Sequence, residues 1–144
     1  MASTPNVELH IEQSPPEGFF VSFDNNKIDI KEWLNYLCEI ATEVLGGSYE
    51  LSVNLISADE IKNLNKAWRK KNTPTDTLSF SYDKSNGEIF LCPEYIAINH
   101  QVYERTLGNF VWFIIIHSMH HLLGYEHGVD MEHAEKIIRS KFGI

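Results

Sequence analysis

The segment that ends in three histidines constrains the fold of this chain more than any other. Residues 110–116 are all apolar, and a helix that is hydrophobic nearly all round its surface belongs in the centre of a domain. The pattern predicts a helix from about Tyr103 to Leu123, with Gly124 just after its end because glycine readily takes a positive φ. The other elements of the chain are therefore expected to surround one central helix.

Alternating and helical patterns divide the rest of the chain into short elements. Apolar side chains at helical spacing predict a helix from the cap Asp29 to Gly46, a second after the cap Ser57, and two more near Pro93–Ile98 and Asp130–Phe142. Strands or short extended pieces are predicted at Val7–Ile11, Phe19–Phe23, Glu50–Ile56, Thr77–Tyr82 and Glu88–Cys92. The segment Lys84–Gly87 contains an Asn-Gly pair, which is typical of a hairpin turn.

Interleaved strands and helices with one hairpin predict an α/β (α+β) fold. We expect a single domain over residues 1–144, with a mixed sheet of about four strands covered by about five helices. The longest apolar run is too short to cross a bilayer, so no membrane partner is expected. The N-terminus resembles no secretory signal, and Cys38 and Cys92 form no metal or redox motif; both features favour a cytoplasmic protein.

His117, His121 and His127 have the spacing of a transition-metal site. His117 and His121 lie four residues apart and so share one face of the predicted helix, while a reversal at Gly124 brings His127 back toward them. Three imidazoles leave one coordination position open, as in catalytic zinc sites, where the metal lowers the pKa of bound water toward about 7. Copper, nickel and iron also accept imidazole, so the pattern predicts a metal more firmly than it predicts zinc.

Histidines on the surface of an amphipathic helix are the alternative interpretation. It would fit two histidines four apart, but it does not explain the added glycine and third histidine on a buried helix. His120 points about 100° away from His121, so we expect it to pack or to support the site rather than to bind metal. His10, His100 and His133 are expected to be structural or solvated.

The histidine spacing matches the metzincin protease signature HExxHxxGxxH at every position except one. Ser118 stands where that signature has its general-base glutamate, which argues against peptide hydrolysis. The same segment more closely resembles HGxLHLxGYDH, the signature of the YbeY family of ribosomal RNA maturation endoribonucleases. Here Ser118, His120 and Glu126 replace the Gly, Leu and Asp of that signature.

A second block supports the resemblance to the YbeY family. The segment Leu64–Ser81 is similar to the family pattern LNxxYRxKDxPTDVLSFP. Gly87-Glu88-Ile89, followed by Cys92-Pro93, resembles the GDIxIxxP region of the family. The substitutions within the first pattern are Trp68 for Tyr, Asn72 for Asp, Thr77 for Val and Ser81 for Pro. The similarity covers roughly Leu51–His133.

The resemblance implies a zincin-like fold, one Zn²⁺ ion on the three histidines, and cleavage of single-stranded RNA. It further implies a role in processing the 3′ end of small-subunit ribosomal RNA and in ribosome quality control, with the ribosome or its proteins as partners. The family pattern places Arg69 at the substrate, where a guanidinium could clamp the scissile phosphate; a solvated cation at a helix end is the alternative. Glu126 is a second catalytic candidate, because it could orient a histidine or activate water, or it could be a surface acid.

Several questions stay open at this point. Thr75 and Asp76 are expected either to fix a turn or to support a metal ligand. Cleavage could proceed by hydrolysis or by attack of the RNA 2′-hydroxyl. A metzincin-type metalloprotease, a non-catalytic ribosome-associated factor stabilised by zinc, and a metal-dependent hydrolase of a small substrate are the competing functions. The formal net charge of −8 argues against indiscriminate nucleic-acid binding, although Arg69, Lys70 and Lys71 form a local basic patch.

Overall fold

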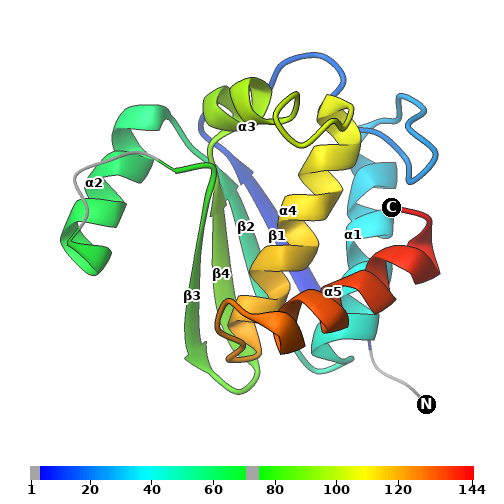
Figure 1. Cartoon of the computed structure of the whole chain (residues 1–144), viewed down its shortest axis with the longest axis vertical. Coiled ribbons are helices and arrows are strands. Elements are labelled where there is room, and N and C mark those ends of the chain that lie inside the picture. The colour runs from blue at the N-terminus through cyan, green and yellow to red at the C-terminus, as the bar shows by residue number, and fades with distance from the viewer. Residues whose placement is uncertain (1–3, 71–74) are drawn as a thin grey trace.

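The computed structural model describes residues 4–70 and 75–144. In chain order the elements are β1 (Asn6–Ile11), α1 (Ile30–Leu45), β2 (Glu50–Leu55), α2 (Ala58–Arg69), β3 (Thr77–Asp83), β4 (Asn86–Leu91), α3 (Pro93–Asn99), α4 (Leu107–Leu122) and α5 (Val129–Phe142), as Figure 1 shows. The predicted class is confirmed: the fold is α/β, with five helices and a mixed four-stranded sheet within the described residues. None of these helices has the length and hydrophobicity needed to cross a membrane.

The strands form one sheet in the order β1-β2-β4-β3. β1, β2 and β4 run parallel to one another, and β3 is an antiparallel edge strand joined to β4 by a hairpin. β4 begins at Asn86, two residues before the predicted start, so the hairpin turn is Lys84–Ser85 and the Asn-Gly pair belongs to the strand. Ser85 donates its backbone N–H to the Asp83 carboxylate at 2.8 Å, which stabilises this tighter turn.

Gly87 is required in the strand because two other elements approach its backbone closely. A Cβ at this position would lie 2.3 Å from the Tyr49 hydroxyl and 2.9 Å from a Leu122 methyl group. The glycine therefore serves the packing of α4 against the sheet, and not the turn.

The two faces of the sheet carry separate apolar clusters. Leu51, Val53 and Leu55 alternate along β2 and join the larger cluster, which lies beneath α1 and α4. The smaller cluster, Ile56, Ile61, Leu78 and Cys92, packs beneath α2 on the opposite face. Helix α4 crosses the sheet at the centre of the molecule, as its apolar sequence predicts, with α1 and α5 against it (Figure 1).

Two predicted elements differ from the structure. Phe19–Phe23 makes only a single backbone bridge, between Val21 and Lys27, instead of a strand. The reason is that this segment packs into the core: Phe19 is fully buried and the Val21 carbonyl accepts a hydrogen bond from the Trp112 indole at 3.0 Å.

Helix α4 begins at Leu107, four residues later than predicted. The Thr106 hydroxyl accepts the backbone N–H of Asn109 at 3.2 Å and so caps the helix. Glu104 has a φ of +55°, which a helix cannot contain. Tyr103 therefore precedes the helix and lies on the surface.

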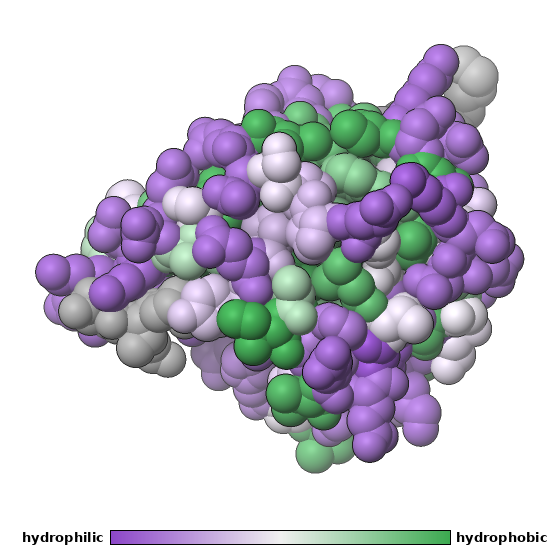
Figure 2. All heavy atoms as spheres, turned by 90° about the horizontal axis from the view of Figure 1, so that it is seen from above, coloured by the Kyte–Doolittle hydropathy of each residue, from purple (hydrophilic) through white to green (hydrophobic). Residues whose placement is uncertain are grey.

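The face of the molecule seen in Figure 2 is mostly hydrophilic, with small hydrophobic patches between the polar side chains. Such scattered apolar groups are ordinary for a folded domain and do not indicate a docking surface.

Candidate metal centre

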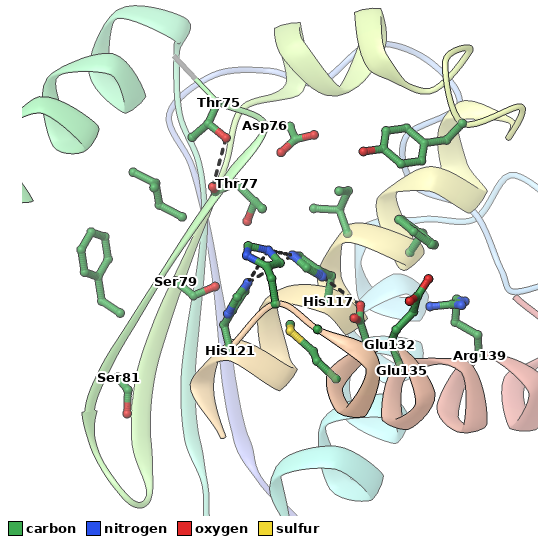
Figure 3. A pocket seen from close by; sticks show the side chains of 18 of the residues that line it. Thr75, Asp76, Thr77, Ser79, Ser81, His117, His121, Glu132, Glu135 and Arg139 are labelled. Atoms are coloured by element: carbon green, nitrogen blue, oxygen red, sulfur yellow. Dashed lines mark hydrogen bonds and ion pairs between the residues drawn. The ribbon is translucent and has the colours of Figure 1, made fainter. Parts of the chain in front are cut away.

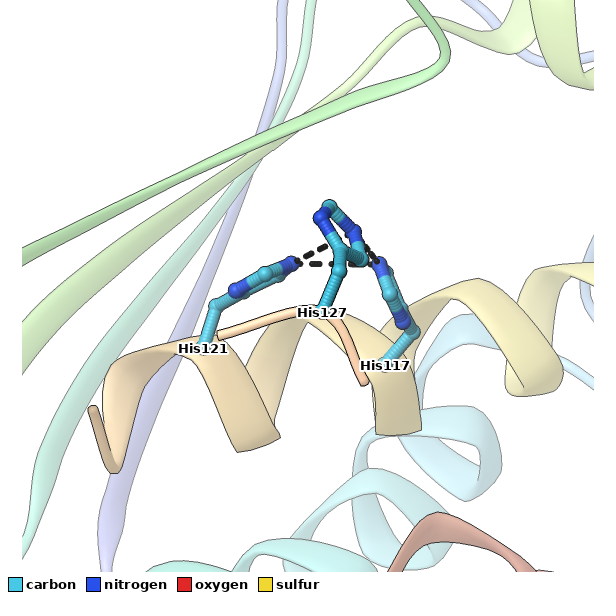
Figure 4. A group of neighbouring side chains, drawn as sticks. All are labelled: His117, His121 and His127. Carbon is cyan, nitrogen blue, oxygen red and sulfur yellow. Dashed lines mark hydrogen bonds between the residues drawn. The ribbon is translucent and has the colours of Figure 1, made fainter. Parts of the chain in front are cut away.

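The three predicted ligands converge at the C-terminal end of α4. The Nε2 atom of His121 lies 3.2 Å from Nε2 of His117 and 3.3 Å from Nε2 of His127, and the last two are 3.3 Å apart. Gly124, with a φ of +96°, reverses the chain between the helix and His127. Figure 4 shows the three imidazoles pointing at one another above the helix.

The other ring nitrogens fix the tautomers of two of these histidines. His121 Nδ1 lies 3.0 Å from the Tyr125 carbonyl oxygen, and a carbonyl can only accept, so Nδ1 carries the proton. His117 Nδ1 lies 2.9 Å from the Glu135 carboxylate and is held in the same tautomer. In the neutral rings, both Nε2 atoms therefore direct unprotonated lone pairs into the same space.

A bound cation would accept these lone pairs, and the distances between the three Nε2 atoms fit zinc. Tetrahedral coordination with Zn–N bonds of about 2.0–2.1 Å places the ligand nitrogens roughly 3.3–3.4 Å apart. The observed separations of 3.2–3.3 Å are close to that range. Among the described residues, this is the group of histidine, cysteine and acidic side chains that could hold a metal ion.

The environment of His121 favours its neutral imidazole, the form that binds metal. Burial lowers the pKa of His121, and the neighbouring His117 lowers it further. Protons therefore compete less well for this ligand than for a solvated histidine.

The histidine cluster opens into a cleft of about 1040 Å³ between β3, α4 and α5. The side chains of Thr77, Ser79 and Ser81 line one wall, because alternation along β3 turns them away from the α2 side (Figure 3). Arg69, at the end of α2, also lines the cleft and is exposed; its contact with substrate stays a prediction. Lys71, Asn72 and Pro74 of the predicted basic and Pro-Thr-Asp segment lie outside the described residues.

Comparison with known proteins agrees with this geometry. Residues 21–142 match the model of the family described as endoribonuclease YbeY. The chain belongs to this family. The endoribonuclease YbeY of Thermotoga neapolitana is 32% identical over 115 residues, 77% of each chain, and that of Ruthia magnifica is 33% identical over 122 residues, 76% of this chain and 84% of the relative.

A solved structure shows the same architecture. The solution structure of a Thermotoga maritima protein superposes with a TM-score of 0.59 at 25% identity, covering 96% of this chain and 89% of that one. The family and the fold predicted from the sequence are thus both confirmed.

Ser118, which stands where the metzincin signature has its general-base glutamate, has a structural role in this protein. Ser118 is fully buried, its hydroxyl lies 2.8 Å from that of Thr77, and its carbonyl accepts the Ser79 hydroxyl at 3.2 Å. These bonds attach α4 to β3. A glutamate at this position would have to displace the strand, so the site is built without a carboxylate on the helix.

The carboxylate that supports the cluster is Glu135, which the sequence analysis missed. It lies on α5, is only 6% exposed and accepts the His117 Nδ1 proton. Metal-binding histidines usually donate to such an acceptor. The available signal was an acid on the apolar face of α5, at helical spacing from Met131 and Ile138.

The other predicted site residues have different surroundings. Glu126 is exposed and is not among the residues lining the cleft, so its catalytic role stays a prediction. Asp76 lines the cleft, but its carboxylate accepts from the Asn99 amide at 3.3 Å and its carbonyl from Cys92 N–H at 2.9 Å. These bonds match the turn-fixing role. The Thr75 hydroxyl makes a long 3.5 Å contact to the Thr77 carbonyl.

The remaining histidines lie apart from the cluster. His120 is 3% exposed, and its Nδ1 lies 2.7 Å from the Ile116 carbonyl, so it packs beneath the helix end as expected. His100 bonds the Arg105 carbonyl at 2.8 Å, which makes it structural. His10 and His133 lie on surface elements.

Proposed function

We propose that this chain is a zinc-dependent endoribonuclease that cleaves single-stranded RNA. The observation that carries the proposal is the convergence of three imidazole Nε2 atoms in an open cleft that also contains Arg69, in a chain of the endoribonuclease YbeY family. Its biological substrate would be the 3′ end of small-subunit ribosomal RNA, in cytoplasmic ribosome maturation and quality control.

His117, His121 and His127 would hold the ion, with Glu135 and the Tyr125 carbonyl orienting two of the rings. Zinc at this place supplies a Lewis acid that polarises a phosphoryl oxygen and offsets the charge that develops during cleavage. Arg69 would bind the same phosphate through its planar, permanently charged guanidinium. The Arg69 side chain is exposed and makes no ion pair with another described residue.

The open cleft suits a single strand. Sequence-selective proteins commonly recognise RNA in single-stranded segments, whose splayed bases and phosphates fit such grooves. The net charge of −8 makes general affinity for RNA weak, so we expect the ribosome or its proteins to supply much of the specificity.

Cleavage of a single-stranded RNA carrying the small-subunit 3′ end tests the proposal. Zinc content and cleavage rate are measured for wild type, His121→Ala and Arg69→Ala. We expect His121→Ala to lose both bound zinc and RNA cleavage, and Arg69→Ala to keep zinc but lose cleavage. Lys66→Ala is the matched control, because it removes an exposed cation from α2 that does not line the cleft.

Two additions extend the assay. Glu126→Gln tests the second catalytic candidate, since a residue that activates water would lose cleavage and keep zinc. Mass spectrometry of the product ends separates hydrolysis from attack by the 2′-hydroxyl, which leaves a cyclic phosphate. No cleavage by the zinc-loaded wild type, alone or with ribosomes, would contradict the proposal.

A further inference from the structure

A second cationic group lies in the wall of the same cleft, where α5 approaches the start of α4. Tyr103, Phe113 and Arg139 line the cleft there, and the Arg105 guanidinium lies against the same Phe113 ring. The guanidinium carbons of Arg105 and Arg139 are 4.4 Å and 5.0 Å from the centre of that ring. We call these four residues the Arg139 cluster.

The two arginines pack against one aromatic ring, and no carboxylate forms an ion pair with either among the described residues. The ion pairs in the described part of the chain involve neither guanidinium, and the Arg105 side chain donates instead to the neutral Asn109 amide oxygen. Burial lowers the pKa of Arg105, and the nearby positive charge of Arg139 lowers it further. Two cations in such proximity repel each other, and an anion bound beside them would relieve the repulsion.

The two α5 acids nearest to Arg139 in sequence form no ion pair with it among the described residues. Glu135 is engaged by His117, and Glu132 lines the cleft as an exposed side chain with no ion pair to Arg139 among the described contacts. Figure 3 shows Glu132, Glu135 and Arg139 along the same side of α5, facing the histidines. The cluster therefore adds positive charge to an otherwise acidic helix face.

An open aromatic surface accompanies the charge. The Tyr103 ring stacks on Phe110 at 5.0 Å, yet Tyr103 is 52% exposed, so part of the ring stays available. A basic groove with exposed aromatic rings is how proteins bind single-stranded nucleic acid, because phosphates pair with the cations while bases stack on the rings.

The position of the cluster relates it to the proposed site of cleavage. Arg139 follows Glu135 by four residues, which is about 6 Å along α5, or one turn. Arg69 ends α2, which lies beyond β3, whereas α5 lies on the α4 side of that strand (Figure 1). The cleft that both arginines line also contains the three histidines. A strand bound by both cations would pass over the histidines.

We propose that the Arg139 cluster is a nucleotide subsite for single-stranded RNA. Arg139 binds a phosphodiester next to the scissile one, Tyr103 stacks on an unpaired base, and Arg105 adds charge from behind Phe113. This inference rests on the proposed function, because it adds a second contact between this cleft and the RNA that the cleft is proposed to cleave.

The test is binding of a fluorescent single-stranded RNA oligonucleotide to the zinc-loaded protein, measured by anisotropy across a salt series. A gel confirms that the probe stays intact. Loss of one phosphate contact on a single strand should reduce the slope of log K against log salt by about 0.7. We expect this reduction for Arg139→Gln and an unchanged slope for Lys136→Gln, which removes an exposed cation from the same helix outside the cleft.

Tyr103→Leu should weaken binding by roughly five- to one-hundred-fold, the usual cost of one lost base stack, whereas Tyr103→Phe should bind like wild type. Wild-type slopes in Arg139→Gln, or equal losses in Arg139→Gln and Lys136→Gln, would overturn the subsite while leaving the proposed function intact. A wild-type protein that neither binds nor cleaves the RNA would overturn the proposed function and the subsite with it.

Discussion

Replacing Glu135 isolates the contribution of one buried carboxylate to metal binding. Its Oε1 atom lies 2.9 Å from His117 Nδ1, and the residue is 6% exposed, so its negative charge acts on the imidazole with little screening by water. The negative charge attracts a cation bound at the imidazole, and the hydrogen bond fixes the direction of the Nε2 lone pair. Both effects strengthen a bond from Nε2 to zinc.

The two effects can be separated by the choice of substitution. Loss of such a supporting partner typically weakens metal affinity about 10- to 100-fold, or about 1.4–2.7 kcal/mol. Glu135→Gln keeps an oxygen that can accept the Nδ1 proton and loses only the charge, so we expect a loss near the lower end, about tenfold. Glu135→Ala also releases the ring, and we expect a loss near the upper end, about 100-fold.

Competition for zinc with a chromophoric chelator measures these affinities, and urea denaturation of the metal-free proteins checks that each variant folds. Glu132→Gln is the matched control. It removes the same charge from the same helix and cleft, but Glu132 makes no hydrogen bond to a histidine among the described contacts. If Glu135→Gln and Glu132→Gln weaken zinc binding equally, the direct bond to His117 is not the cause, and the reasoning fails.

Three further predictions concern stability and the absence of a helix carboxylate. Burial lowers the folded-state pKa of His121, so the free energy of unfolding of the metal-free protein should decrease as the pH falls below about 6.5, the pKa of histidine in the unfolded chain. Urea titrations at pH 7.5 and 5.5 measure this decrease, and it should be smaller in a His121→Gln variant. Ser118→Ala should cost about 1 kcal/mol through the lost bond to Thr77. Ser118→Glu should unfold at a lower urea concentration than Ser118→Ala. A stable, zinc-loaded Ser118→Glu protein that digests casein would contradict the structural role of the serine. Gly108→Ala should lower the free energy of unfolding by about 1–3 kcal/mol, because its Cβ would lie 2.1 Å from a Val21 methyl group; unchanged denaturation would refute this packing.

Much of the site could be predicted from local sequence. Within one helix the direction of each side chain follows from its position, so His117 and His121 had to share a face, and Gly124 could reverse the chain toward His127. The same reasoning located the caps Asp29 and Ser57, whose side chains accept from the backbone three residues later.

Predictions failed where a segment's conformation depends on a distant partner. Alternating apolar residues suggested a strand at Phe19–Phe23, but this segment packs against Trp112 and pairs with no strand. The Asn-Gly pair suggested a turn, but Gly87 is in the strand because Tyr49 and Leu122 leave no room for a side chain. In each case tertiary packing outweighed a local preference.

The sequence by itself determined the three histidines, the family and the alternation of strands and helices, because spacing within one element fixes geometry over a few residues. Only the tertiary structure decided which groups complete the cleft. Glu135 meets His117 across 18 positions of the chain, and Arg69 lines the same cleft as Arg139 from a helix on the far side of β3. Such contacts depend on how whole helices pack on the sheet, and periodicity within one segment carries no information about the direction or distance of another.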